Sequence, residues 1–280
     1  MFGKQYYSLV AGLREYTLDA DIKGFDARAI IDEIRAQLSS SDRKVLDMFY
    51  TYYDIENILA MRSARSRFSV LGNFTREELA AELEKPSALP QFITRILYAY
   101  DNPDSIEAQG VDLTVPLERA LFAAYYAQCE KSKSGFMVRW AVFDRTLRNI
   151  IAALTARSKG IAVSDVVVGG GDTVESLSRS SASDFGLRAE IEYMDAVLSA
   201  VSDDANLLEK ERKIDMIRWD KSEELTAFDY FNIDAVLAYL VRVNIVYRWM
   251  GLDAATGRAM YEKLIGSLSA EDKIRGGDDK

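Results

Sequence analysis

The chain contains no histidine, a single cysteine and only four prolines among its 280 residues. The missing histidine removes the usual general base near neutral pH, and with the lone Cys129 it excludes metal sites built from histidine and cysteine. One cysteine forms no disulfide within a chain, so we expect Cys129 to be an apolar core residue in a reducing compartment. Four prolines and sixteen glycines are too few turn signals for an all-β protein, which favours long helices.

Basic residues are outnumbered by acidic ones, and long apolar runs are scarce. The 35 Lys and Arg face 44 Asp and Glu, and the resulting net charge of −9 opposes nucleic acid as a main partner. The most apolar stretch, 231–250, is interrupted by Asp234, Arg242, Asn244 and Arg248, so we expect a buried helix and no membrane span. The opening MFGKQYYSLVAGL is not typical of a signal peptide, and we expect a cytoplasmic protein.

An internal repeat is the most informative feature that is present. The string NILAMRSARSR begins at Asn57, returns as NIIAALTARSK at Asn149, and has a fainter echo, NIVYRW, at Asn244. Asn149 lies 92 residues after Asn57, and Asn244 lies 95 residues after Asn149. We therefore expect three helical repeat units. Their predicted bounds are 1–105, 106–205 and 206–280, the last with a frayed, charged tail from Ala270.

Apolar residues recur at three- and four-residue spacing around each asparagine, which predicts an all-α fold. The stripe of the first unit is Leu46, Phe49, Tyr50, Tyr53, Ile58 and Met61. The stripe of the second is Val138, Val142, Leu147, Ile150, Ile151 and Leu154, and that of the third is Val236, Leu237, Leu240, Val243, Tyr247 and Met250. Adjacent tyrosines, such as those at 52–53 and 125–126, cannot all face one core, so we expect some at interfaces.

A second repeated pattern follows the first two predicted long helices. An apolar run ending in glycine precedes Thr-x-Glu-x-Leu in both units, so we take Gly72 and Gly170 as repeat positions. The pattern predicts a helix stop, a turn and a new helix. Thr75 with Glu78 forms a capping box, and we expect Asp172 with Glu175 to do the same in the second unit.

Three asparagines within apolar helices need hydrogen-bond partners, because an unpaired buried amide is costly. We interpret Asn57, Asn149 and Asn244 as structural, each amide bonding the backbone of a neighbouring loop and pinning the turn that follows. Cationic side chains gather after the first two of them. Arg62, Arg65, Arg67, Arg157 and Lys159 suit helix C-termini, where cations complement the macrodipole, and alternatively they contact a partner's acidic loops or anionic lipid headgroups.

No pattern in the sequence assembles a catalytic site. The carboxylate pairs look like solvated helix starts or loops, and no two point to a shared acid–base pocket. The loop from Gly169 to Asp172 is placed as a phosphate-binding loop would be, yet no Lys-Ser or Lys-Thr follows and the G-x-G-x-x-G spacing is absent. We predict no enzyme activity and no catalytic, cofactor-binding or metal-binding residues.

The first repeat resembles a known family. The block Y-x-D-I-E-N-I-L-A-M-R-S-A-R followed by V-L-G-N-F-T-R-E-E-L is similar to the C subunit of archaeal and bacterial V/A-type rotary ATPases, whose eukaryotic counterpart is the d subunit. Asp54, Asn57 and Ile58 match the family's helix, and V-L-G at 70–72 matches its turn. In the second unit Asn149 matches, while Thr146 stands in place of the aspartate.

The likeness extends to both ends of the chain. The stretch AYLVRVNIVYRWMGLDAATG resembles the family's last helix and its turn. The opening YYSLVAGLREYTL is similar to uncharacterised bacterial proteins that are encoded among V-type ATPase subunits. The resemblance implies three helical-bundle domains in a pseudo-threefold, funnel-like arrangement.

The function implied by the resemblance is non-catalytic. Such a protein seats the rotor shaft of the central stalk on the membrane proteolipid ring and transmits torque during proton or sodium transport. It would be cytoplasmic and associated with the inner face of the cell membrane only through the complex. Two alternatives remain open, a free-standing helical repeat adaptor for an unrelated protein and an enzyme that uses the loop from Gly169 to Asp172 for a phosphate ligand.

Overall fold

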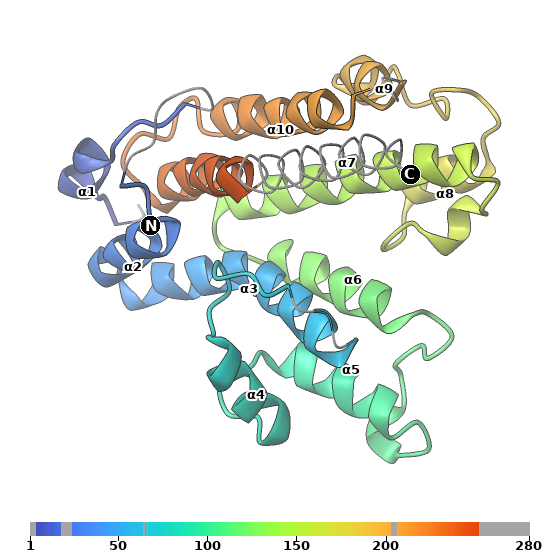
Figure 1. Ribbon diagram of the computed structural model, residues 1–280, viewed down its shortest axis with the longest axis horizontal. Helices are drawn as coiled ribbons and strands as arrows, with labels where there is room; N and C mark the ends of the chain where they lie inside the picture. Colours follow the sequence, from blue (N-terminus) through green and yellow to red (C-terminus); the bar gives the residue numbers. More distant parts are fainter. Residues whose placement is uncertain (1–3, 18–23, 64, 66, 203–205, 252–280) are drawn as a thin grey trace, which may run out of the picture.

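The computed structural model describes residues 4–17, 24–63, 65, 67–202 and 206–251. Within these ranges every regular element is a helix and there is no strand (Figure 1). The predicted all-α fold class is therefore confirmed. The expected tail from Ala270 lies outside the described residues.

The elements follow the chain in the order of the predicted units. In the first unit the described helices are α1 (Tyr7–Gly12), α2 (Ala27–Gln37), α3 (Ser40–Arg62), α4 (Arg76–Glu84) and α5 (Gln91–Asp101). In the second they are η1 (Ile106–Ala108), α6 (Leu117–Cys129), α7 (Gly135–Ser158), η2 (Val163–Asp165), α8 (Asp172–Arg179) and α9 (Met194–Ser202). The third contributes α10 (Leu207–Glu224) and a helix whose described part is 233–251.

Each long helix that carries a repeated asparagine begins at a polar cap. The Ser39 hydroxyl accepts from the Asp42 N–H at 3.2 Å, and the Ser134 hydroxyl accepts from the Met137 N–H at 3.0 Å. The Asn232 side chain accepts from the Ala235 N–H at 3.1 Å. These bonds satisfy N–H groups that a helix start leaves unpaired, so the residues before each helix fix where it begins.

The two short helices that follow α3 and α7 start differently. Thr75 and Glu78 form the predicted capping box at α4. The matching prediction for α8 is wrong, because Asp172 is already the first helical residue and Gly171 precedes it with φ 102° and no side-chain cap. Only glycine adopts that backbone conformation readily, so the glycine run replaces the side-chain cap in the second unit.

The helices lie in two main groups (Figure 1). α7, α10 and helix 233–251 lie lengthwise together, and α3 and α6 lie below them with α4 and α5 at the outer edge. α6 packs against α3, α5 and α7, and α9 packs against α7 and α10. Helices on either side of the predicted boundary at residue 105 are thus in direct contact.

One continuous core of buried apolar side chains runs through the units. Tyr50 of α3, Phe136 of α7 and Leu237 of helix 233–251 are fully buried in it. Burying a side chain such as Phe136 or Leu237 stabilises the fold by roughly 2 kcal/mol. Val142 of the second predicted stripe is 43% exposed and lies outside this core. Among the described helices, none combines the length and apolar character that crossing a membrane requires.

Candidate functional site

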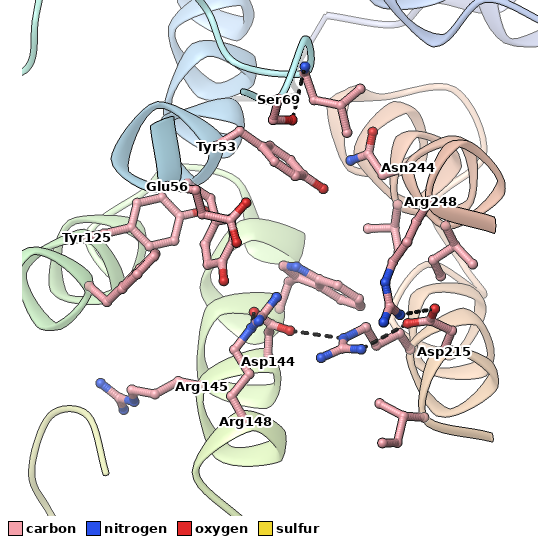
Figure 2. Close-up of a pocket in the computed structure, with 18 of the residues that line it drawn as sticks. Tyr53, Glu56, Ser69, Tyr125, Asp144, Arg145, Arg148, Asp215, Asn244 and Arg248 are labelled. Carbon is pink, nitrogen blue, oxygen red and sulfur yellow. Dashed lines mark hydrogen bonds and ion pairs between the residues drawn. The ribbon is translucent and has the colours of Figure 1, made fainter. Parts of the chain in front are cut away.

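A cavity of about 620 Å³ lies where the three predicted units meet. Its wall takes residues from α3, α6, α7, α10 and helix 233–251 (Figure 2). The cavity is open to water, because Glu56 of α3 and Arg148 of α7 both line it and both are exposed. Residues from all three predicted units therefore contribute to one accessible concave surface.

Two of the repeated asparagines hold loops beside this cavity in the same way. The Asn57 amide donates to the Ser69 carbonyl at 2.9 Å and accepts from the Ser69 N–H at 2.7 Å. The Asn149 amide donates to the Val168 carbonyl at 2.9 Å and accepts from the Val168 N–H at 2.8 Å. Each side chain thus pairs with both backbone groups of one residue, an arrangement we call the asparagine clasp. The predicted loop-pinning role is confirmed for Asn57 and Asn149.

The third asparagine is used differently. Asn244 lines the cavity, and its side-chain oxygen accepts a 3.2 Å hydrogen bond from the buried Tyr50 hydroxyl. Within the described part of the chain its amide holds no loop backbone, so the predicted clasp is absent there. Figure 2 shows the Asn244 side chain beside the cavity, with Tyr53 pointing toward it from α3.

The loop of the first unit is fastened by a second buried side chain. Asp54 accepts from the Asn73 N–H and side-chain amide, both at 2.7 Å, and from the Phe74 N–H at 3.4 Å. Burial raises the pKa of Asp54 to about 6, although these hydrogen bonds act to lower it. A Cβ atom on Gly72 would lie 2.6 Å from the Asp54 carboxylate. The close approach explains why glycine stands there.

The two predicted repeat glycines are not equivalent. A Cβ atom on Gly170 would meet nothing within 4 Å, in contrast to Gly72. In the second unit the glycine that is closely packed is Gly169. A Cβ atom on Gly169 would lie 3.5 Å from the Arg145 side chain, and its φ is 83°. The pattern in the sequence therefore located the turn but not the residue that needs to be glycine.

Arginines at the start of the preceding helices clamp the same two loops. Arg28 of α2 donates to the Gly72 carbonyl at 2.7 Å and to the Val70 carbonyl at 3.5 Å. Arg119 of α6 donates to three carbonyls, those of residues 164, 165 and 167, at 2.9 to 3.1 Å. Clasp and clamp together satisfy the loop carbonyls and hold both loops firmly against the cavity rim.

The floor of the cavity is a buried ionic network centred on Asp144 of α7. Asp144 accepts from the Tyr126 hydroxyl at 2.8 Å, from Arg148 at 2.7 Å and from Arg218 of α10 at 3.3 Å. Burial acts to raise the pKa of Asp144, but the charges of Arg148 and Arg218 outweigh it and hold the pKa below its usual value. Asp144 is therefore ionised at neutral pH.

Arg218 extends this network to the third unit. It also donates to Asp215 at 2.9 Å, and Asp215 accepts in turn from the Trp249 indole at 3.0 Å and from Arg248. Arg248 pairs with Glu211 as well. Acidic and basic groups thus alternate from α7 through α10 to helix 233–251, and the buried carboxylates of Asp144 and Asp215 each have cationic partners, as a buried charge requires.

Four tyrosines form the side of the cavity that α3 and α6 provide. Tyr52, Tyr53, Tyr125 and Tyr126 all line it, and burial raises the pKa of each, so the hydroxyls stay protonated at neutral pH. The Arg148 guanidinium lies 4.6 Å from the Tyr52 ring centroid, a cation–π contact. We expected adjacent tyrosines to separate between core and interface, whereas Tyr125 and Tyr126 are both buried.

Four charged side chains of the wall are exposed, Glu56, Arg67, Glu118 and Arg148, and two of them also contact the protein closely. Arg148 keeps 42% of its side-chain surface exposed despite its bond to Asp144. Glu56 is exposed as well, while the protein around it raises the pKa of its carboxyl group through burial. A group that is both surrounded by protein and reached by water lies in a concavity, and such positions suit charge recognition of an entering partner.

The structure does not gather the five predicted contact cations into one patch. Arg62 forms an ion pair with Asp101, and Arg157 donates to the backbone carbonyls of Ser180 and Ala182. Arg65 and Lys159 are exposed, and Arg67 is exposed at the cavity. Arg62 and Arg157 lie in the last turns of α3 and α7, so the macrodipole interpretation fits their positions.

The chemistry available to this site is hydrogen bonding and charge pairing. Tyrosine hydroxyls and the Asn244 amide offer donors and acceptors, and Glu56 and Arg148 offer accessible charges of both signs. Across the described residues, no group of three or more His, Cys, Asp or Glu side chains is placed to hold a metal ion. Hydrogen-bonding and charged groups of this kind match polar ligands, a polar protein surface among them.

Sequence reasoning missed the ionic network. Asp144 and Arg148 lie four residues apart inside the apolar stripe of α7, and Asp215 and Arg218 lie three apart in α10. Opposite charges at helical spacing within an apolar stripe were the available signal. The spacing of charged residues within one helix does not identify their partners on another helix. The bond from Arg218 to Asp144 could therefore not be predicted from the sequence.

Comparison with known proteins places the chain in a family. Residues 3–272 match the profile of the family described as "Protein of unknown function (DUF2764)". The match runs through all three predicted units. No curated protein and no solved structure gives a significant match to the chain.

Proposed function

The chain belongs to the family DUF2764, and we propose that it is a non-catalytic central-stalk component of a V/A-type rotary ATPase. In this role it couples the rotor shaft to the membrane proteolipid ring of a machine that transports protons or sodium ions. The resemblance of its repeats to the C subunit of these ATPases is the starting point. The pseudo-threefold funnel and the association with the membrane face through the complex belong to the same proposal.

The observation that carries the proposal is the cavity shared by all three units. A protein that seats a shaft needs a concave, polar surface that the shaft end can enter. The cavity has accessible charges at Glu56 and Arg148 and lies at the junction of five helices. Its lining is spread over three repeats, as expected for a socket.

A second requirement of the role is stiffness, because torque must pass through the protein without being absorbed. The asparagine clasps hold two loops to the long helices, and the network of Asp144, Arg218 and Asp215 ties α7 to α10. Ties between helices of different units resist their relative sliding. This supports a coupling role over an extended solenoid, whose repeats contact only their neighbours.

The proposal is tested by binding to purified rotor-shaft subunits. The wild-type chain should bind them, and Glu56→Arg should weaken binding at least tenfold by reversing a charge inside the cavity. Glu107→Arg is the matched control, since Glu107 is exposed on η1 outside the cavity and the same charge change should leave binding unaltered.

Recovery from native cells provides the opposing test. In detergent that keeps the ring intact, the tagged chain should bring down shaft subunits and the catalytic ATPase head. Recovery of an unrelated protein without either would favour the adaptor function and count against the stalk assignment.

A further inference from the structure

The third asparagine has hydrogen-bonding capacity that the fold leaves unused. Asn244 is only 7% exposed, and the Tyr50 bond occupies one lone pair of its side-chain oxygen. Its side-chain N–H groups have no partner in the described part of the structure. The Tyr53 hydroxyl, which points toward Asn244 in Figure 2, likewise has no hydrogen bond among the described residues. Two unpaired polar groups thus meet at one place on the cavity wall.

Both groups line the water-accessible cavity, so water serves as their partner in the free protein. A ligand that fills the cavity displaces this water and has to replace its hydrogen bonds, because an amide withdrawn from water without a partner loses its solvation uncompensated. The carbonyl of a carboxamide accepts two hydrogen bonds and its nitrogen donates two. Asn244 can therefore keep its bond to Tyr50 and still accept one bond and donate another.

The other two repeats show what this side chain binds. Asn57 and Asn149 each pair with the N–H and C=O of a single residue, at 2.7 to 2.9 Å. Asn244 stands at the repeated asparagine position of the sequence, on a third long helix that also begins at a polar cap. The ligand with matching chemistry is a segment of polypeptide main chain.

We propose that Asn244 forms a third asparagine clasp with one main-chain residue of the rotor shaft when the shaft enters the cavity. The inference rests on the proposed function and names the contact that holds the shaft. The Tyr53 hydroxyl adds a second bond to the same segment, and Glu56 and Arg148 pair with its charged side chains. Main-chain recognition tolerates sequence change in the shaft, because every residue except proline offers the same two groups.

The test follows exchange of the side-chain amide protons by NMR in the full-length chain. Asn57 and Asn149 should exchange slowly in the free protein, since their amides are bonded. Asn244 should exchange at least tenfold faster in the free protein and slow to a similar rate when purified shaft subunits are added. Loss of its signal in Asn244→Leu makes the assignment.

Two results of this measurement would overturn the inference. Slow exchange of Asn244 in the free chain would mean that this chain fills the clasp itself. Fast exchange both before and after the shaft binds would mean that no clasp forms.

Binding measurements separate this inference from the proposed function. Asn244→Leu should weaken shaft binding at least tenfold, whereas Tyr50→Phe, which removes only the neighbouring hydroxyl, should weaken it less than threefold. Equal binding by wild type and Asn244→Leu would reject the clasp while the stalk function stands. Failure of the wild-type chain to bind the shaft at all would reject both.

Discussion

At the scale of single residues, Gly72 and Asp54 show how tightly one loop is built. The glycine leaves room for a carboxylate that fastens the two residues after it, Asn73 and Phe74. A Cβ atom at 2.6 Å from that carboxylate would force either the loop or Asp54 to move. Gly72 is thus required by space, since its φ is not positive.

Replacing Gly72 by alanine should destabilise the protein by about 2 kcal/mol, because overpacking a closely packed site typically costs that much. Gly170→Ala is the matched control. Its added methyl group meets open space at an ordinary φ, so its free energy of unfolding should change by less than about 0.5 kcal/mol. Urea unfolding of both variants measures the difference, and equal stability of the two would contradict the packing described.

Asp54 should also give the protein a pH dependence. Its pKa rises from 3.8 to about 6 on burial, so the folded state holds this proton more tightly than the unfolded state. The stabilisation from the protonated form is complete below pH 4 and is lost as the pH rises through 6. The free energy of unfolding should fall by about 3 kcal/mol across this window on account of Asp54.

Comparison with Asp54→Asn isolates that contribution from other titrating groups. The stability of wild type minus that of the variant should decrease between pH 4 and pH 7. Denaturant unfolding at several pH values measures it. A difference that stays constant over this range would show that the carboxyl group is already ionised at pH 4.

Residue roles differed in how far the sequence revealed them. An amide inside an apolar helix needs a hydrogen-bond partner, because burying it without one costs free energy. The structural interpretation of Asn57 and Asn149 followed from that cost. The choice of Gly72 over Gly170 did not follow, because it depends on the 2.6 Å approach of a side chain 18 residues earlier in the sequence. Such a distance is set only in the folded protein, where the loop packs against α3, so the sequence does not reveal it.

At the scale of elements, the repeated unit is a long capped helix with a loop held to it. The loops differ in length, since the clasped residue lies 12 positions after Asn57 and 19 positions after Asn149. The clasp and the arginine clamp recur in both units despite that difference. Geometry is therefore better preserved between the repeats than the spacing along the chain.

Loss of one clasp should cost about 2 kcal/mol of stability, because both backbone groups of a partly buried residue lose their partner. Asn149→Leu tests this in the second unit. Thr155→Val is a control on the same helix, since it removes a side-chain bond to the Ile151 carbonyl that belongs to no clasp. Thermal unfolding should show a clear loss for the first variant and a small change for the second, and similar values would argue against the clasp.

The three apolar stripes lie within the three long helices, as predicted, and one of the two predicted helix starts was wrong. The caps at Ser39 and Ser134 and the box at Thr75 follow local rules that act within four residues. The start of α8 depends instead on the backbone conformation of Gly171, which allows a glycine to replace the cap. In a run of three glycines, the sequence does not show which one adopts the positive φ that precedes the helix.

At the scale of the whole molecule, the buried ions join helices that are distant in sequence. Arg218 bridges Asp144 and Asp215, and the carboxylates of these two residues are almost completely buried. Removing Arg218 takes a charged partner from both carboxylates at once and leaves each with a single arginine, Arg148 or Arg248.

Arg218→Met should therefore lower the free energy of unfolding by about 3 kcal/mol. Arg179→Met is the control, because Arg179 is 80% exposed and its pair with Glu175 contributes at most about 0.5 kcal/mol. Chemical unfolding of both variants in low and high salt measures these values. A loss for Arg218→Met no larger than the control's would mean that the network adds nothing to the stability.

The all-α class could be read from the chain, whereas the cavity could not. The spacing of apolar residues and the small number of turn residues predict helices. Each apolar stripe can be recognised from its own segment of the sequence. The cavity needs Tyr126, Asp144 and Arg248 to meet across three helices. That meeting depends on how helices cross, which periodicity within one helix leaves undetermined.

The buried Asp234 has one more consequence. Its carboxylate accepts from the Ser134 hydroxyl at 2.5 Å and from the Phe136 N–H at 3.0 Å, which fastens the first turn of helix 233–251 to that of α7. The two helices run in the same direction from this point (Figure 1), and the cavity residues Asn149 and Asn244 lie further along them. Asp234 therefore fixes the separation of the two helices at their N-terminal ends, before the segments that line the cavity.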